Sequence, residues 1–93
     1  MDVWIETAAG NLVRSATLAI VIRPGESGNG WEVCISASAP PSVFAAGFGS
    51  REEARLIRNA LAVAISGAKA CEGTPAVFFD RETLTVKTED LAG

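Results

Sequence analysis

The sequence predicts an α+β fold, in which an antiparallel β-sheet of five or six strands packs against one face of a main α-helix and a C-terminal hairpin completes the domain. Three observations predict this fold. Residues 3–48 alternate as strands do, a helix start signal lies at Ser50, and residues 51–66 repeat their apolar positions with helical spacing. A chain of 93 residues buries one small core, so residues 1–93 are predicted to form one domain.

Residues 3–48 are predicted to form a β-meander. Residues 3–7 and 11–14 are expected to pair around a Gly-Asn turn, because these residues tolerate the positive φ angles of tight turns. Residues 17–23 are apolar on both sides of the alternation. This pattern favours a strand that is central in its sheet or covered on both faces.

Residues 31–39 alternate strictly and predict a strand with one packed face and one solvated face. Glu32 and Cys34 are expected on the solvated face. Pro40 and Pro41 end this strand, and residues 42–48 are expected to add a short further strand.

The helix is predicted over residues 51–66, with Gly67 as its C-terminal stop. Ser50 and Glu53 form a capping box, in which Ser50 accepts from the first turn and Glu53 reaches back to the backbone N–H of Ser50. The face predicted to cover the sheet consists of Ala54, Ile57, Leu61, Ala64, Ile65 and Ala68.

The C-terminal hairpin is predicted over residues 75–88. Two short strand-like runs, 75–79 and 84–88, flank Asp80-Arg81-Glu82-Thr83. Polar residues between two such runs are typical of a turn, so the two runs are expected to pair.

A second apolar group, Leu56, Ala60 and Val63, lies on a flank of the predicted helix. The apolar arc is therefore wider than the ~100° that one-sided packing needs. Two explanations stay open. The C-terminal hairpin covers this flank within one molecule, or a second copy covers it and the protein is a homodimer.

Arg51, Arg55 and Arg58 share a third face of the helix at spacings of four and three residues. This stripe is either a solvated face or a contact surface for an acidic partner, whose charge would relieve the repulsion between the arginines. A separate candidate is the helix entry. Gly47, Gly49, Ser50 and Arg51 resemble a loop that binds an anion or nucleotide at a helix N-terminus, although glycines there also serve the sharp turn alone.

Trp4 lies on the same side of its predicted strand as Asp2 and Glu6. It is either a core residue or a partly exposed anchor for a partner, a role in which tryptophan is common.

The composition excludes several functions. The chain has no His and no Tyr, which removes the usual triads and imidazole ligands, and no other catalytic motif is visible, so the chain is predicted not to be an enzyme. Cys34 and Cys71 are expected to be two reduced thiols, with a disulfide as the alternative. No metal site and no cofactor are predicted.

The charge and hydropathy pattern indicates which partners and which cellular location to expect. A net charge of −3 makes nucleic acid and anionic membranes unlikely partners. The sequence shows neither an apolar run of spanning length nor a secretory signal, so the expected location is the cytoplasm of a bacterium or the host of a phage.

Two groups of residues carry resemblances. The first group consists of Asn11-Leu12-Val13, Ile20 and Ile22, Trp31 and Val33, and Phe48, Ser50, Glu52, Glu53 and Ala54. This group resembles small uncharacterised bacterial and phage proteins with a β-meander followed by one helix. Residues 20–23, 31–36 and 49–54 also resemble the HicB-like antitoxin fold, which implies inhibition of a small ribonuclease.

The sequence therefore favours a non-catalytic protein-interaction domain of bacterial or phage origin that forms a homodimer. The alternatives are an antitoxin-like inhibitor of a small ribonuclease and a small anion- or nucleotide-binding module at the helix start.

Overall fold

In the computed structural model, residues 3–14, 19–25, 28, 30–36 and 41–92 are described, and they form one helix and seven strands. The α+β class is confirmed, and the strands outnumber the five or six expected. The elements are β1 (Trp4–Glu6), β2 (Leu12–Arg14), β3 (Ala19–Pro24), β4 (Trp31–Ser36), β5 (Ser42–Phe48), α1 (Arg51–Ala68), β6 (Pro75–Asp80) and β7 (Thr85–Asp90).

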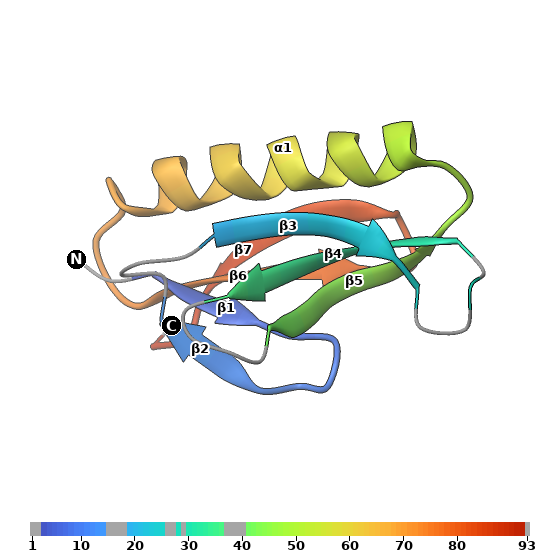
Figure 1. The fold of residues 1–93 in the computed structure, drawn as a ribbon. Helices are drawn as coiled ribbons and strands as arrows, with labels where there is room; N and C mark the ends of the chain where they lie inside the picture. Colours follow the sequence, from blue (N-terminus) through green and yellow to red (C-terminus); the bar gives the residue numbers. More distant parts are fainter. Residues whose placement is uncertain (1–2, 15–18, 26–27, 29, 37–40, 93) are drawn as a thin grey trace.

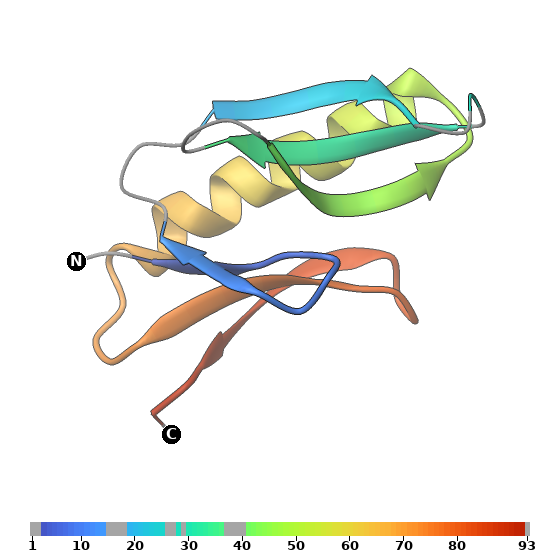
Figure 2. The same ribbon diagram turned by 60° about the horizontal axis from the view of Figure 1, so that its bottom comes forward.

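The strands form two sheets, where the sequence predicted one. One sheet has the order β2-β1-β6-β7 and the other has the order β3-β4-β5. All neighbours are antiparallel except β1 and β6, which run parallel. The β6–β7 hairpin thus joins the first hairpin of the chain, and Figure 2 shows this four-stranded sheet apart from the three-stranded one.

The helix α1 lies along one side of both sheets (Figure 1). Ala54, Leu61 and Ala68 are buried on its inner face, which confirms the predicted core stripe. Ile57, Ala64 and Ile65 pack beside them. Because one apolar stripe contacts strands of both sheets, α1 holds the two sheets together.

Aromatic rings and one backbone hydrogen bond join the two sheets below the helix. The Phe79 ring of β6 makes edge contacts with Phe44 and Phe48 of β5, at centroid distances of 6.3 and 5.8 Å. Ala8 N–H, after β1, donates to the Val43 carbonyl of β5 at 2.8 Å. These contacts join the two sheets directly, in addition to the contacts that both sheets make with α1.

The helix start matches the prediction in part. Glu53 N–H donates to Ser50 Oγ at 3.2 Å, so Ser50 is the N-cap. The Glu53 carboxylate accepts from Gly49 N–H at 3.3 Å, one residue before the expected donor. At the other end the predicted stop is wrong, because Gly67 lies inside the helix, which continues to Ala68.

Replacing Ser50 with Ala removes the acceptor for Glu53 N–H. We expect this change to lower the free energy of unfolding by about 1 kcal/mol. Ser66→Ala is the matched control, because Ser66 is an exposed helical residue at which Ala is the better helix former. Urea unfolding followed by circular dichroism measures both variants. Equal stability of the two variants would contradict the capping role.

The outer face of β4 differs from the expectation of a solvated face. Glu32 and Cys34 are 6% and 0% exposed. Glu32 forms an ion pair with Arg23, its neighbour across the β3–β4 register, and the Cys34 thiol lies 3.7 Å from the same carboxylate. A buried carboxylate needs a charged or hydrogen-bonding partner, which Arg23 supplies to Glu32. This face of β4 is therefore packed and not solvated.

Candidate functional site

Three large aliphatic side chains of α1 and the β6–β7 turn are exposed on one side of the molecule. Leu56, Val63 and Leu84 are 69%, 72% and 64% exposed. We call these three residues the apolar surface. Leu56 and Val63 lie two helical turns apart on one face of α1. The explanation that the C-terminal hairpin covers this flank is therefore wrong for both, whereas Ala60 between them is half-buried.

Leu84 is next to Leu56 in space although it comes from another element. Both line a hollow of about 310 Å³ between the first turns of α1 and the β6–β7 turn. Phe48, Glu53 and Ile57 form the rest of its wall. The hollow is mainly apolar and open to solvent, so it suits the side chain of a protein partner.

The backbone of Leu84 is in the left-handed region, with φ at +56°, and Leu84 is the one described non-glycine residue with a positive φ. It ends the four-residue turn Arg81–Leu84. Gly or Asn commonly fills such a position, since a branched side chain there costs about 1–2 kcal/mol. Leu84 is thus strained by the turn that it ends, and most of its side chain faces solvent.

The turn that holds Leu84 is fixed by Asp80. Its carboxylate accepts from Glu82 N–H at 2.9 Å and pairs with Lys87 Nζ at 2.7 Å. These contacts hold the pKa of Asp80 below its ordinary value, with the Lys87 hydrogen bond as the main cause. Asp90 has a lowered pKa as well, because its carboxylate accepts from the N–H groups of Ala92 and Thr74.

The hairpin is expected to lose stability in acid. A carboxylate with a lowered pKa in the folded state stabilises the protein above its unfolded pKa, and this contribution is lost as the pH falls below about 4. Thermal unfolding between pH 6 and pH 2.5 measures the effect. The loss should be smaller in Asp80→Asn, which no longer titrates at that position. Identical pH profiles of the two proteins would contradict this role of Asp80.

The glycines at the helix entry serve the backbone. Gly47 has a φ of +87° and lies where β5 bulges against β4, a conformation that favours glycine. Gly49 N–H donates to the Glu53 carboxylate, and Glu53 N–H donates to Ser50. Two backbone donors that an anion would use are therefore already bonded within the chain.

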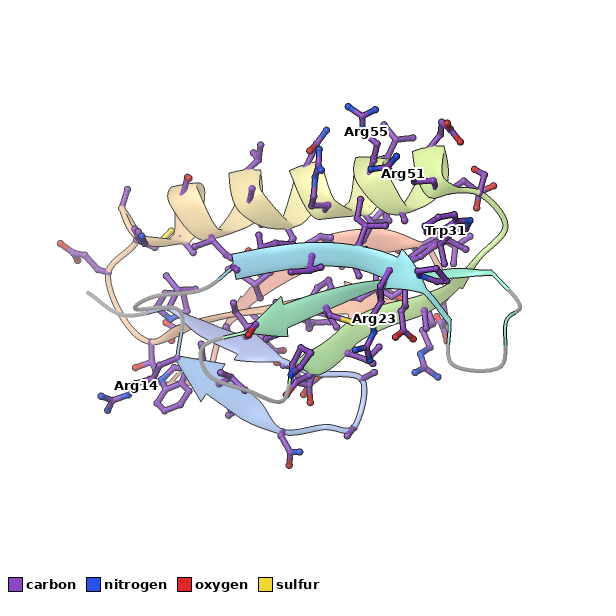
Figure 3. All side chains as sticks on the ribbon, in the orientation of Figure 1. Arg14, Arg23, Trp31, Arg51 and Arg55 are labelled. Atoms are coloured by element: carbon purple, nitrogen blue, oxygen red, sulfur yellow. The ribbon has the colours of Figure 1, made fainter. Side chains whose placement is uncertain are left out.

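The three arginines of α1 lie in one row, as expected, but in different surroundings. Arg51 and Arg55 are exposed, and both stand on the first turns of the helix, where Figure 3 shows Arg55 pointing away from the sheets. Arg58 is half-buried and donates from Nε and Nη2 to the Asn59 side chain at 3.1 and 3.0 Å. Arg51 and Arg55 are thus the two that project freely towards solvent.

Trp4 is neither fully buried nor fully exposed. Its ring lies under the Arg14 guanidinium of the neighbouring strand β2, 5.3 Å from the ring centroid. This cation–π contact covers part of the ring, so Trp4 is a weaker candidate for an anchor than the apolar surface.

The remaining features bear on metals, cysteines and membranes. No disulfide joins Cys34 and Cys71, since Cys34 is buried at β4 and Cys71 is exposed after α1. The described part of the chain contains no cluster of three or more acidic or cysteine side chains that would hold a metal ion. Within the same residues, no helix combines the length and the apolar character needed to cross a membrane.

Sequence reasoning found Leu56, Ala60 and Val63 but missed Leu84. The sequence placed Leu84 at the start of the second hairpin strand, whereas the structure has it as the last residue of the turn, and β7 begins at Thr85. Comparison with protein-family models, curated proteins and solved structures gave no match, so the resemblances to β-meander proteins and to HicB-like antitoxins stay predictions.

Proposed function

We propose that this chain is a non-catalytic protein-interaction domain that self-associates through the apolar surface. The observation that carries the proposal is the combined exposure of Leu56, Val63 and Leu84 on one side of the molecule. Single exposed leucines are common on proteins, but three large exposed aliphatic groups, two of which line one apolar hollow, are typical of an interface.

The exposure of Leu84 supports the same proposal. Leaving 64% of this side chain in water raises the free energy of the monomer. A contact with another protein would lower that free energy by burying the side chain. The position of Leu84 beside Leu56 makes both residues available to one partner.

The alternative of an anion- or nucleotide-binding module receives less support. Its residues Gly47, Gly49 and Ser50 are explained by the β-bulge and by the helix cap. Arg51 and Arg55 remain exposed and available for an acidic partner. An antitoxin-like role, a bacterial or phage origin and a cytoplasmic location rest on the sequence.

Sedimentation equilibrium of the full chain over about 5–500 μM tests the proposal, because a modest interface gives dissociation constants in this range. We expect the average mass to rise from the monomer value of 9.6 kDa towards twice that value. A mass that stays at 9.6 kDa throughout would overturn self-association.

A further inference from the structure

We propose that an extended acidic segment of a partner protein adds to β3 as a further strand and places its carboxylates against Arg51, Arg55 and Arg58 of α1. We call these three arginines the basic row. The basic row lies on the other side of α1 from Leu84. Binding of the acidic segment therefore does not depend on the proposed self-association and names a second partner.

The basic row is a cationic side of an acidic protein. The chain has a net charge of −3, yet three of its eight basic residues share this side of the helix. Arg51, Arg55 and Arg58 lie within roughly 60° of one another around α1, Glu52 lies roughly 60° beyond Arg55, and Glu53 faces the apolar hollow. No carboxylate of the described residues forms an ion pair with the basic row. An acidic partner would supply the missing negative charge.

The basic row faces the three-stranded sheet. The opposite side of α1 faces the β6–β7 turn, because Glu53 and Leu56 line one hollow with Leu84. The helix contacts β3 as well as β7, so the side with the basic row lies towards β3. Figure 1 shows the C-terminal end of β3 below the first turns of α1, and Figure 3 shows Arg51 and Arg55 above that end.

The outer edge of β3 offers backbone groups for another strand. β3 ends the order β3-β4-β5, and no described strand pairs with its outer edge. Gly25 N–H donates to the Gly30 carbonyl at 3.0 Å, and this bonded pair directly follows Pro24 in the β3–β4 register. Bonded and non-bonded pairs alternate along an antiparallel ladder, so the N–H and C=O groups of Ile20 and Ile22 point away from β4. A strand of a partner protein can bond to these groups.

The side chains of β3 also suit a neighbouring strand. They are apolar on both faces, a pattern typical of strands that have a neighbour on each side. Ile20 and Ile22 pack towards the core, whereas Val21 points to the outer face and is 41% exposed. An apolar residue on the outer face of an added strand would cover Val21. The other face of the added strand then lies below the basic row.

An extended segment matches the spacing of the arginines. Alternate residues of a strand repeat on one face at about 6.7 Å, and Arg51 and Arg55 are separated by about 6 Å along the helix axis. Carboxylates at every second position therefore face successive arginines. A nucleic acid also carries negative charge, but it has no peptide groups to complete the edge of β3. The open edge thus favours an acidic protein segment over a nucleic acid.

Fluorescence anisotropy with a labelled eight-residue peptide that alternates Glu and Val tests the proposal. We expect the full chain to bind this peptide with a dissociation constant below about 100 μM. The same peptide with Gln in place of Glu should bind at least about tenfold more weakly. Equal binding of the two peptides, or no binding up to about 500 μM, would overturn the proposal. Tighter binding of single-stranded DNA with the same charge would also overturn it, and would assign the basic row to a nucleic acid.

Charge reversal within the basic row tests the site. Arg55→Glu should weaken binding of the Glu-Val peptide at least about tenfold, because like charges then face each other. Arg81→Glu is the matched control, since Arg81 is exposed at the β6–β7 turn and the change in net charge is the same. If both variants weaken the binding equally, the net charge and not the basic row attracts the peptide.

Amide hydrogen exchange tests the added strand itself. With saturating peptide, the amides of Ile20 and Ile22 should exchange at least about tenfold more slowly, because they gain hydrogen bonds. The amide of Val21 points towards β4 and serves as the internal control, so its exchange should change less. Peptide binding without slower exchange at Ile20 and Ile22 would overturn strand addition at β3.

Discussion

Val63→Glu is expected to raise the dissociation constant of the dimer at least about 100-fold, because a carboxylate within the apolar surface must lose its hydration on association without gaining a partner. Val63 is 72% exposed in the monomer, so the substitution removes little internal packing. Glutamate is also a better helix former than valine. The fold should therefore stay intact while the association is lost.

Ala62→Glu is the matched control for this variant. Ala62 is an exposed residue of the same helix, and it lies roughly 100° around the helix from Val63, so the change adds the same charge outside the apolar surface. Sedimentation velocity of both variants at one concentration gives the comparison. If the two variants associate equally well, the apolar surface is not the interface.

Leu61→Ala is expected to lower the free energy of unfolding by about 3 kcal/mol, within the usual range of about 2–5 kcal/mol for a buried leucine. Leu61 is 0% exposed and lies in the core that α1 forms with the strands. Removing its branched end leaves a cavity at the place where the helix holds the sheets. In a domain of this size the melting temperature should fall by roughly 12–24 °C.

Leu56→Ala is the matched control in the same helix, because it makes the same chemical change at a residue that is 69% exposed. At a concentration where the protein is monomeric, its stability should change by less than about 0.5 kcal/mol. Urea unfolding measures both variants. A similar loss in both would show that the inner and outer faces of α1 are assigned incorrectly.

The helix was predictable because its signals are local. The cap residue Ser50 and the apolar spacing of Ala54, Leu61 and Ala68 are set within a few residues of one another, and the structure has each of them in the expected role. The end of the helix was less predictable. Gly67 can stop a helix or continue it, and the choice depends on contacts beyond the sequence pattern.

The division into two sheets was not predictable, because it depends on contacts between distant parts of the chain. The strand β1 has three residues, and its parallel partner β6 follows some seventy positions later. The same holds for residues 17–23, whose apolar pattern favoured a strand that is central in its sheet or covered on both faces. Residues 19–24 form the edge strand β3, which packs Ile20 and Ile22 towards the core and leaves Val21 41% exposed.

The candidate site was half predictable. The width of the apolar arc on α1 identified Leu56 and Val63 from the sequence alone. Leu84 belongs to a turn whose position beside the helix follows from the fold, so no periodicity reveals it. The positive φ of Leu84 is a backbone property, and it became visible in the structure.

The most direct test of the account is a comparison of ¹H–¹⁵N correlation spectra of the wild-type chain at low and high concentration. Each backbone amide reports on its own surroundings, so the spectra locate the contact without any mutation. We predict that concentration-dependent shifts gather along the outward side of α1, from Glu52 to Lys69, and at the turn that ends in Leu84. Shifts confined to another surface, such as the β1–β2 strands around Trp4, or spectra that do not change with concentration, would contradict the account.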